Sequence, residues 1–363
     1  MLPTHQPILA LGADLKNAIT LVAEGQAFVS QHIGDVEHYE SLRAFRETIR
    51  DLLAMYQVDT SRLIVAHDAH PQYATALAAL ELPCLRRIAV QHHRAHIASV
   101  LCEREAWDTR VIGVSFDGTG YGDDGSIWGG EFFHGSLRQG FERVMHLRTA
   151  NLPGGDAAAR YPVQCVAGFL AQMPDVPDMA DAPFQFPTRY QQSQQLLQAG
   201  LRTFLSTSVG RLFDAAAALL GFTREVSFEG QAAMWVESMA RSADLRDAYA
   251  FPVKDAELDF RPLLTAILND RIKGRDAAAI ARAFQRGVAQ GTGHALRGLC
   301  GAHGVNTVVL SGGVFQNQLL LEDLRELIGA DLKIWVNAAV PPNDGGISLG
   351  RAAIAAIGAQ PRA

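Results

Sequence analysis

At 363 residues, the chain is long enough to bury one large core or two moderate ones, and its 48% hydrophobic and 19% charged composition is typical of a globular protein. The net charge of −6, with no cluster of Lys or Arg along the chain, argues against a nucleic-acid partner, which needs a basic surface. No stretch approaches the ~20 apolar residues of a membrane span, so we expect no membrane partner.

The N-terminal part of the chain predicts strands that alternate with helices. Short apolar runs separated by turn residues predict three strands, at Ile8–Gly12, Ala18–Ala23 and Ala27–Ser30. Apolar residues at helical spacing from Leu42 to Tyr56 predict a helix. A buried-type strand, an Ala-rich helix and another strand follow, at Leu63–Ala66, Tyr73–Leu80 and Ile88–Gln91.

The same pattern starts again at Val111. An apolar run predicts a strand over Val111–Phe116, and the turn-rich sequence D-G-T-G-Y-G-D-D-G after it predicts a loop. Two further strands are expected at Ile127–Phe133 and Phe141–Leu147, followed by a mostly helical insertion from about residue 155 to 302. The last predicted elements are a strand, a helix, a strand and an Ala-rich helix opened by P-P-N-D-G-G, the first three at Thr307–Leu310, Leu319–Ile328 and Leu332–Val336.

This order predicts an α/β protein with an internal duplication. Twice, a hairpin of strands that carries glycine and an acid precedes alternating helices and strands. The two halves are similar in the order of their elements and not in amino-acid sequence. We expect the two halves to face each other across one cleft, which is where a ligand is expected to bind.

The sequence Q-H-H-R-A-H, at residues 91–96, is the strongest chemical signal in the chain. Because His92 and His96 are four residues apart, both imidazoles project from one face of a helical turn and can share a metal ion. The alternative is a histidine pair that is solvated or packed in the core. Three histidines at a strand–helix junction, where α/β folds place ligands, favour the metal site. The role of His93 stays open.

Two aspartates could complete such a site. Asp117 ends the strand that enters D-G-T-G-Y-G, and Asp344 lies in P-P-N-D-G-G at the start of the last helix. Carboxylates are common further ligands beside histidine. Each aspartate also has an ordinary explanation, because Asp is frequent in glycine-rich turns and at helix N-termini. Their convergence on the histidines is a hypothesis about the fold.

Four glycine-rich turns at strand ends indicate a nucleotide. Glycine lets backbone N–H groups approach a phosphate closely, and a helix N-terminus favours its charge. None of the turns matches a Walker motif or a complete G-x-G-x-x-G motif. The turns are Gly12–Asn17, Asp117–Gly122, Leu152–Asp156 and Ser311–Asn317.

The insertion contains polar groups that could bind a ribose. Arg211 and Asp214 are three residues apart and could form a local helical ion pair. Alternatively, Asp214 or Glu229 contacts ribose hydroxyls. The residue types alone leave both interpretations open.

The cysteines are Cys84, Cys102, Cys165 and Cys300. They are widely spaced and form no C-x-x-C pair, so we expect neither a zinc ribbon nor a disulfide framework. We interpret them as buried thiols. The N-terminus has no basic segment before a long apolar run, and we expect a cytoplasmic protein.

Taken together, these segments resemble the C-terminal carbamoyltransferase region of the HypF family, which acts in [NiFe]-hydrogenase maturation. The resemblance runs nearly end to end and includes VQHHRAHIASVLCE, FDGTGYGDDGSIWGGEF, SVGRLFDAAAALLG, LSGGVFQN and PPNDGGISLG. It implies the two-lobed, duplicated actin/Hsp70-like (RNase H-like) fold of the acetate/sugar kinase–Hsp70–actin superfamily. We place one lobe at residues 1–104 plus 342–363, and the other at residues 105–341 with the helical insertion at about 155–302.

By this resemblance, the expected metal ligands and catalytic residues are His92, His96, Asp117 and Asp344, with iron or zinc as the ion. The residues implied in nucleotide binding are Gly118, Thr119, Gly120, Gly155, Asp156, Asp214, Glu229, Gly230, Gly312, Gly313 and Asn317. The family usually has a third histidine at the position of Arg94. That position lies between the two expected histidine ligands.

The resemblance implies transfer of a carbamoyl group from carbamoyl-adenylate to the C-terminal cysteine thiolate of HypE, with ATP and carbamoyl phosphate as substrates and AMP as a product. HypF normally carries an acylphosphatase domain, a zinc-finger region and a YrdC-like domain, which makes the adenylate, before this region. Here the similar stretch begins within ten residues of Met1. We therefore expect a short form or an excised region, whose adenylate comes from another polypeptide or from this fold itself.

Three other functions fit parts of the pattern. A small-molecule O-carbamoyltransferase shares the fold and the histidine motif. A tRNA threonylcarbamoyladenosine synthase subunit is related, but the acidic charge balance and the D-G-T-G-Y-G form argue against it. A non-catalytic module that binds nucleotide or HypE is the alternative from another class of protein.

Overall fold

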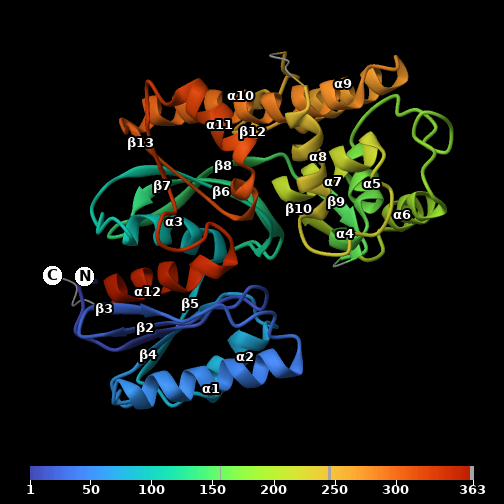
Figure 1. The fold of residues 1–363 in the computed structure, drawn as a ribbon. Coiled ribbons are helices and arrows are strands. Elements are labelled where there is room, and N and C mark those ends of the chain that lie inside the picture. Colours follow the sequence, from blue (N-terminus) through green and yellow to red (C-terminus); the bar gives the residue numbers. More distant parts are fainter. Residues whose placement is uncertain (156, 244–246, 360–363) are drawn as a thin grey trace.

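The computed structural model describes residues 1–155, 157–243 and 247–359, so Asp156 lies outside the described residues. The chain forms two sheets, one above the other in Figure 1, with helices on their faces and a helical region at one side. Within the described ranges, no helix is both long enough and apolar enough to cross a membrane.

The first sheet has five strands in the order β3-β2-β1-β4-β5. The hairpin strands β1, β2 and β3 pair antiparallel, whereas β1, β4 and β5 run parallel. The strands are β1 (Ile8–Ala10), β2 (Thr20–Ala23), β3 (Gln26–Val29), β4 (Ile64–Asp68) and β5 (Arg86–Val90). The helices between them in sequence are α1 (Tyr39–Met55) and α2 (Ala74–Glu81).

Side chains of this sheet alternate between two cores, as the period of a β-strand requires. Leu9 and Val65 pack with Phe45 of α1 on one face. Their neighbours Ile8 and Ile64 pack on the other face, in a core that includes residues of α3 (His92–Cys102) and α12 (Ile347–Gly358). Both faces of the sheet are therefore covered by helices.

The second sheet repeats this arrangement. Its central strands lie in the order β8-β7-β6-β13-β14, again with antiparallel pairing among the first three and parallel pairing after them. This repeat confirms the duplicated actin/Hsp70-like fold. The strands are β6 (Val111–Tyr121), β7 (Ile127–Ser136), β8 (Gly140–Leu147), β13 (Thr307–Ser311) and β14 (Lys333–Val336).

Short strands extend the second sheet at the side of the insertion. Two of them continue the sheet beyond β8, and the other two form a pair that joins β7. The sequence patterns did not predict them, because segments of two to four residues are too short for a periodicity to be recognised. They are β11 (Val253–Lys254) and β12 (Glu257–Leu258), and β9 (Ala150–Pro153) and β10 (Thr203–Ser206).

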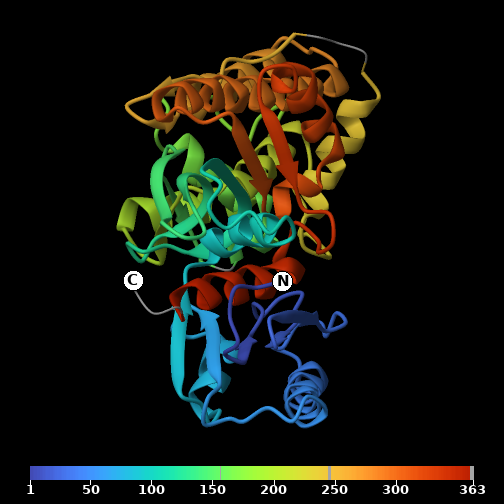
Figure 2. The ribbon, with the colours of Figure 1, turned by 90° about the vertical axis from the view of Figure 1, so that its left-hand side faces the viewer.

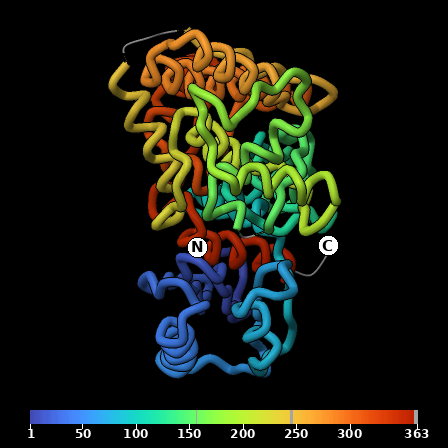
Figure 3. Tube along the Cα trace, turned by 90° about the vertical axis from the view of Figure 1, so that its right-hand side faces the viewer, coloured from blue at the N-terminus to red at the C-terminus, as the bar shows by residue number. Residues whose placement is uncertain are grey.

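The insertion is mostly helical and covers the side and the top of the second sheet (Figures 1 and 3). Its helices are α4 (Ala157–Arg160), α5 (Pro162–Leu170), α6 (Thr188–Ala199), α7 (Val209–Leu220), α8 (Gln231–Arg241), α9 (Phe260–Ile272) and α10 (Ala277–His303). The chain then returns to the sheet through β13, the short helix η1 (Gly313–Gln316) and α11 (Gln318–Ile328).

Helices α3 and α12 pack against each other between the two sheets (Figures 1 and 2). Their backbones approach closely at Gly350, where a Cβ atom would lie only 1.8 Å from the carbonyl oxygen of Ala95. The short helix η2 (Asp344–Gly346) leads into α12. The boundaries of the two lobes stay a prediction.

One predicted loop is a strand in the structure. The sequence D-G-T-G-Y was expected to leave the sheet after Phe116, but β6 continues to Tyr121. The pairing with β7 is irregular between Phe116 and Gly120 and resumes at Gly120, opposite Trp128. The turn comes only afterwards, where the N–H of Gly122 donates to the carbonyl of Ser126. The glycines that were assigned to a loop, Gly118 and Gly120, therefore lie in the bulge and in the last part of the strand.

Candidate metal centre

Four side chains of the types that bind metals meet between the two sheets. They are His92 and His96 from α3, Asp117 from β6 and Asp344 from η2. One potential ligand atom from each residue lies within 4.8 Å of the others. Residues far apart in the sequence therefore form one cluster, and both histidines in it are buried.

Helix α3 orients the two histidines. It begins at His92, and the side chain of Gln91 caps it by accepting a hydrogen bond from the N–H of Arg94. Nε2 of His92 lies 3.2 Å from Oδ2 of Asp117 and 3.3 Å from Oδ1 of Asp344. Nε2 of His96 lies 3.1 and 3.5 Å from the same two oxygens. The four-residue spacing thus directs both rings to one point.

Asp117 lies in the irregular part of β6. Its Oδ1 accepts hydrogen bonds from the N–H of Gly118, at 2.8 Å, and the N–H of Gly313, at 3.2 Å. These two bonds leave Oδ2 directed at the histidines. The bulge therefore aims the carboxylate, a role that bulges next to active sites often have.

The charges in the cluster depend on one another. Burial lowers the pKa of both histidines, but Asp344, Asp117 and Asp68 together raise the pKa of His92 well above its ordinary value. Hydrogen bonds to Asp117 and Asp344 likewise raise the pKa of His96. Burial raises the pKa of both aspartates, but the histidines hold the pKa of Asp117 well below its usual range and lower that of Asp344 to about 2. The site favours positive charge between two carboxylates.

This set of donors fits a divalent metal ion. Two imidazole nitrogens and two carboxylate oxygens are ligands that both zinc and iron accept, and four of them can surround one ion. A pair of histidines packed for structure alone would not need two carboxylates at the same point, one of them buried and the other only partly exposed. The role of the four residues as metal ligands stays a prediction.

Several of the residues expected to bind a nucleotide border the cluster. Gly118 and Gly313 donate to Asp117, as described, and a Cβ atom on Gly118 would lie 3.2 Å from Nη2 of Arg211. Arg211 and Asp214 are buried on α7 and approach to 3.0 Å. That approach lacks hydrogen-bond geometry, so Nε and Nη1 of Arg211 and Oδ2 of Asp214 have no hydrogen-bond partner.

The remaining expected residues have varied surroundings. Gly312 has a φ of +107° at the end of β13, where a Cβ atom would lie 2.3 Å from the carbonyl oxygen of Phe116. Thr119 is exposed on β6. Asn317 caps α11 by accepting from the N–H of Leu320. The other members are Gly120, which packs on His93; Gly155, which packs on Phe204; Glu229, which pairs with Lys16; and Gly230, which precedes α8.

Comparison with known families identifies this arrangement. Residues 3–103 match the model of the HypF Kae1-like domain, and residues 113–351 match the model described as carbamoyltransferase, Kae1-like domain, second subdomain. The chain belongs to the HypF carbamoyltransferase family.

Individual HypF proteins agree with this assignment. Carbamoyltransferase HypF2 of Cupriavidus necator is 35% identical over 96% of the chain and 46% of its own length, and the carbamoyltransferase HypF homolog of the same organism is 34% identical over 97% and 92%. A structure of full-length HypF in a phosphate- and nucleotide-bound form superposes with a TM-score of 0.88, at 35% identity over 97% of this chain and 55% of that one. The structure of T. kodakarensis HypF also superposes with a TM-score of 0.88. It is 31% identical over 98% of this chain and 48% of its own length. The chain spans about half the length of the first of these relatives.

The structure adds residues that sequence reasoning missed. Asp68, at the end of β4, lies 3.3 Å from Nδ1 of His92 and pairs with Arg351. Lys16, in the turn after β1, forms an ion pair with Glu229 from the other half of the HypF-type fold. Both follow or flank predicted strands. An acid at the end of a strand parallel to the one before the histidines was a signal that could have indicated Asp68.

His93, whose role the sequence left open, does not join the cluster. It is buried, and Nε2 of Gln91 lies 3.0 Å from its Nδ1. Burial, and then the charge of His92, lower the pKa of His93 well below its ordinary value. Its ring fills the space beside Gly120, where a Cβ atom would lie 2.4 Å from Cε1. His93 therefore packs as a neutral ring behind the site.

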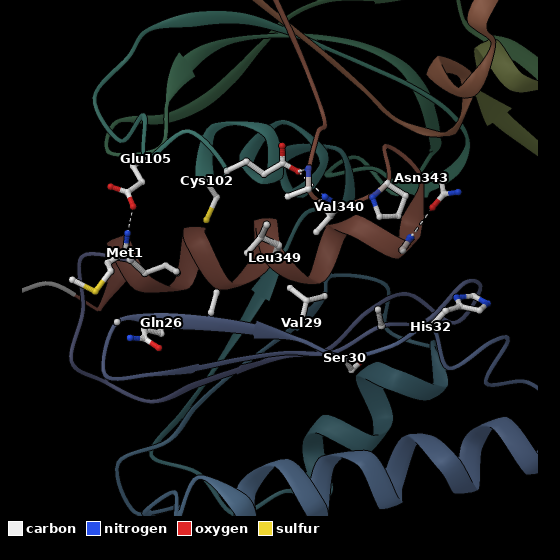
Figure 4. A pocket seen from close by; sticks show the side chains of 18 of the residues that line it. Met1, Gln26, Val29, Ser30, His32, Cys102, Glu105, Val340, Asn343 and Leu349 are labelled. Atoms are coloured by element: carbon white, nitrogen blue, oxygen red, sulfur yellow. Dashed lines mark hydrogen bonds and ion pairs between the residues drawn. The ribbon is translucent and has the colours of Figure 1, made fainter.

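A groove of about 850 Å³ lies beside the cluster, between β3 and the segment before η2 (Figure 4). Asn343 and Gly345, on either side of Asp344 in the sequence, line one end of it. Cys102, at the end of α3, lines another part, and burial raises the pKa of its thiol to about 12. This HypF-type chain therefore has no reactive thiolate at that position.

Proposed function

We propose that this chain transfers a carbamoyl group from carbamoyl-adenylate to the C-terminal cysteine thiolate of HypE, in the cytoplasm, as a step of [NiFe]-hydrogenase maturation. Membership of the HypF carbamoyltransferase family supports the reaction type. The observation that carries the proposal is the largely buried group of two histidines and two aspartates between the two halves of the fold.

The surroundings of Asp117 support binding of the adenylate next to this group. Backbone amides of Gly118 and Gly313 already face a carboxylate there, and such amides also suit a phosphate. Arg211, whose Nη2 lies near Gly118, forms a buried ion pair with Asp214, but Nε and Nη1 of Arg211 and Oδ2 of Asp214 make no hydrogen bond. A buried polar atom without a hydrogen bond is costly, so hydroxyl groups of a ribose would satisfy these atoms.

The chain's own residues would hold the donor in place for attack. A divalent ion held by His92, His96, Asp117 and Asp344 would supply Lewis acidity to the phosphate or carbonyl oxygen. Lys16 brings a positive charge to the same region. Burial lowers the pKa of its ammonium group, but Glu229, and then Asp344 and Asp117, raise it above its ordinary value. The acceptor sulfur forms a bond to the carbonyl carbon, the bond from that carbon to the phosphate oxygen breaks, and AMP leaves with the bonding electrons.

The state of three of the four cysteines, all but the half-buried Cys84, supports an acceptor thiolate from another protein. Cys102, Cys165 and Cys300 are buried, and burial raises the pKa of each thiol, to about 12 for Cys102 and about 11 for Cys300. A thiol with such a pKa supplies very little thiolate at neutral pH. These cysteines are therefore poor nucleophiles.

The mass of HypE tests the proposal. The chain is incubated with HypE, ATP and carbamoyl phosphate, with and without a separately purified enzyme that forms carbamoyl-adenylate. We expect HypE to gain about 43 Da, one carbamoyl group in place of a proton, in at least one of these mixtures. The double variant His92→Ala, His96→Ala should lose this transfer while its circular dichroism spectrum is unchanged.

A second pair of histidines provides the matched control. His134 and His303 stack with ring centroids 4.1 Å apart, outside the cluster. The double variant His134→Ala, His303→Ala should transfer at the rate of the unchanged protein. Transfer retained by the His92/His96 variant contradicts the proposal. A gain in mass on a hydroxylated small molecule, with none on HypE, supports a small-molecule O-carbamoyltransferase instead.

A further inference from the structure

Behind the metal cluster, Asp68 contacts the outer nitrogen of His92. Asp68 is the last residue of β4, and its side chain is fully buried. Its Oδ2 lies 3.3 Å from Nδ1 of His92, on the side of the ring opposite to Nε2, which faces Asp117 and Asp344. His92 thus has carboxylates at both ring nitrogens: Asp117 and Asp344 at Nε2, in the cluster, and Asp68 at Nδ1, behind it.

Further bonds hold the Asp68 carboxylate in place. The N–H of His70 donates to Oδ1 at 2.8 Å. Arg351 of α12, also fully buried, pairs with Oδ2 and donates from Nη1 to the carbonyl oxygen of Leu11 at 2.7 Å. The carboxylate therefore joins the end of β4, the first turn of α3 and the last helix.

We propose that Asp68, held by Arg351, is a positioning residue that keeps the Nδ1 proton of His92 in place, so that the Nε2 lone pair faces the metal ion. This inference rests on the metal-binding part of the proposed function. A carboxylate behind a histidine ligand fixes the orientation and tautomer of the ring and increases its basicity. His92 therefore binds the ion more strongly than an imidazole without that partner.

Arg351 makes this arrangement possible in a buried place. An unpaired carboxylate there would be strongly destabilising, and its negative charge would add to those of Asp117 and Asp344. The guanidinium neutralises Asp68 and also fixes the plane of its carboxylate. The pair therefore orients His92 without adding net charge to the site.

Zinc affinity tests the proposal. The chain is titrated with Zn²⁺ alone in competition with a chromophoric chelator, for the unchanged protein and for Asp68→Asn, which keeps the shape of the side chain and removes its charge. We expect the zinc dissociation constant of Asp68→Asn to rise about 10- to 100-fold. A zinc dissociation constant that is the same in both proteins overturns the proposal. A protein without the substitution that binds no zinc also overturns it.

Asp323→Asn is the matched control. Asp323 is equally buried, and Arg282 and Arg286 bind its carboxylate at 2.6 to 2.8 Å within the helical region. The same substitution there also removes a buried, arginine-paired charge, but it should leave zinc affinity unchanged. An equal loss of affinity in both variants would indicate a general effect on stability and would overturn the positioning role.

A second measurement needs no variant and covers the case in which Asp68→Asn fails to fold. In the zinc-loaded protein with ¹⁵N-labelled histidine, NMR should show His92 with a hydrogen-bonded proton on Nδ1 and with zinc on Nε2. Zinc on Nδ1 and a proton on Nε2 would overturn the proposal. A protein that binds zinc in this way but transfers no carbamoyl group contradicts the proposed function and leaves this inference standing.

Discussion

Asp214 has the most unusual ionisation among the residues expected to bind the nucleotide. Burial raises its pKa, Arg211 lowers it, and the result is a pKa of about 6. Glu229 adds to the upward shift. A carboxyl group of this kind carries a proton in the folded protein at mildly acid pH, when an aspartate of the unfolded chain has already lost it.

This difference predicts a stability that falls as pH rises. Between the unfolded pKa of about 3.9 and the folded pKa of about 6, the Asp214 carboxyl binds more protons in the folded state, so its contribution to the free energy of unfolding decreases with pH. Replacing the carboxyl by Asp214→Asn should remove a decrease on the order of 1–3 kcal/mol across this interval. Urea denaturation at several pH values measures it, and parallel curves for the two proteins would contradict the assigned shift.

At the residue scale, the sequence predicted the residues with a strong local pattern. The four-residue spacing of His92 and His96 indicated a shared face. Asp117 and Asp344, each beside a glycine-rich turn, were candidates to complete the site, and the resemblance to HypF implied all four residues as ligands. Asp68 follows a predicted strand, and that position could have indicated it. Its partner Arg351 could not be predicted, because their contact spans 283 residues and depends on how α12 lies against the first sheet. Single buried charges of this kind have no periodicity or motif.

At the scale of elements, the contact between α3 and α12 determines the position of the histidines. Gly350 allows it, since a Cβ atom there would be 1.8 Å from the carbonyl oxygen of Ala95 and 2.9 Å from the N of Ser99. Both neighbours are backbone atoms of α3, one residue before His96 and three after it. Neither can move unless the helix moves.

Gly350→Ala should therefore destabilise the protein although alanine favours helices. We expect a loss of about 1–3 kcal/mol in the free energy of unfolding, the usual cost of overpacking a core. Gly298→Ala is the control, because Gly298 is an exposed glycine of α10 with nothing near its Cβ position, and it should gain about 0.5–1 kcal/mol. A neutral or stabilising Gly350→Ala, measured by urea denaturation, would be inconsistent with this packing.

Elements with a clear hydrophobic period were predicted, and those defined by pairing alone were not. Strands such as β4 and β13 are short buried runs between turn residues, so their residues indicated them directly. The end of β6 was mistaken for a loop because glycine and aspartate usually favour turns. In the structure, pairing with β7 outweighs that local preference.

For the whole molecule, the cluster is a connection between the two halves. His92 and His96 follow a strand of the first sheet, whereas Asp117 belongs to a strand of the second. The duplication itself was predicted from the repeated order of strands and helices. How closely the two halves approach was not, because no local pattern encodes the distance between segments of different sheets.

A bound ion should therefore stabilise the whole fold. An ion that binds only the folded state adds about 2.7 kcal/mol when its free concentration is 100 times the dissociation constant. Adding a strong chelator to zinc-loaded protein should lower the melting temperature, whereas the His92→Ala, His96→Ala variant should show no change. Differential scanning calorimetry measures both, and an equal response of the two proteins would argue against binding at this cluster.

The raised pKa values of His92 and His96 have a consequence for the uptake of that ion. Because these pKa values are raised, the two imidazoles of the metal-free protein stay protonated to higher pH than free imidazole, and the protons lie where the cation would bind. A metal must displace them, so loading acidifies an unbuffered solution, and apparent affinity increases as the medium becomes more alkaline. The pH of the solution thus determines how readily the metal-free protein releases these protons and binds a metal ion.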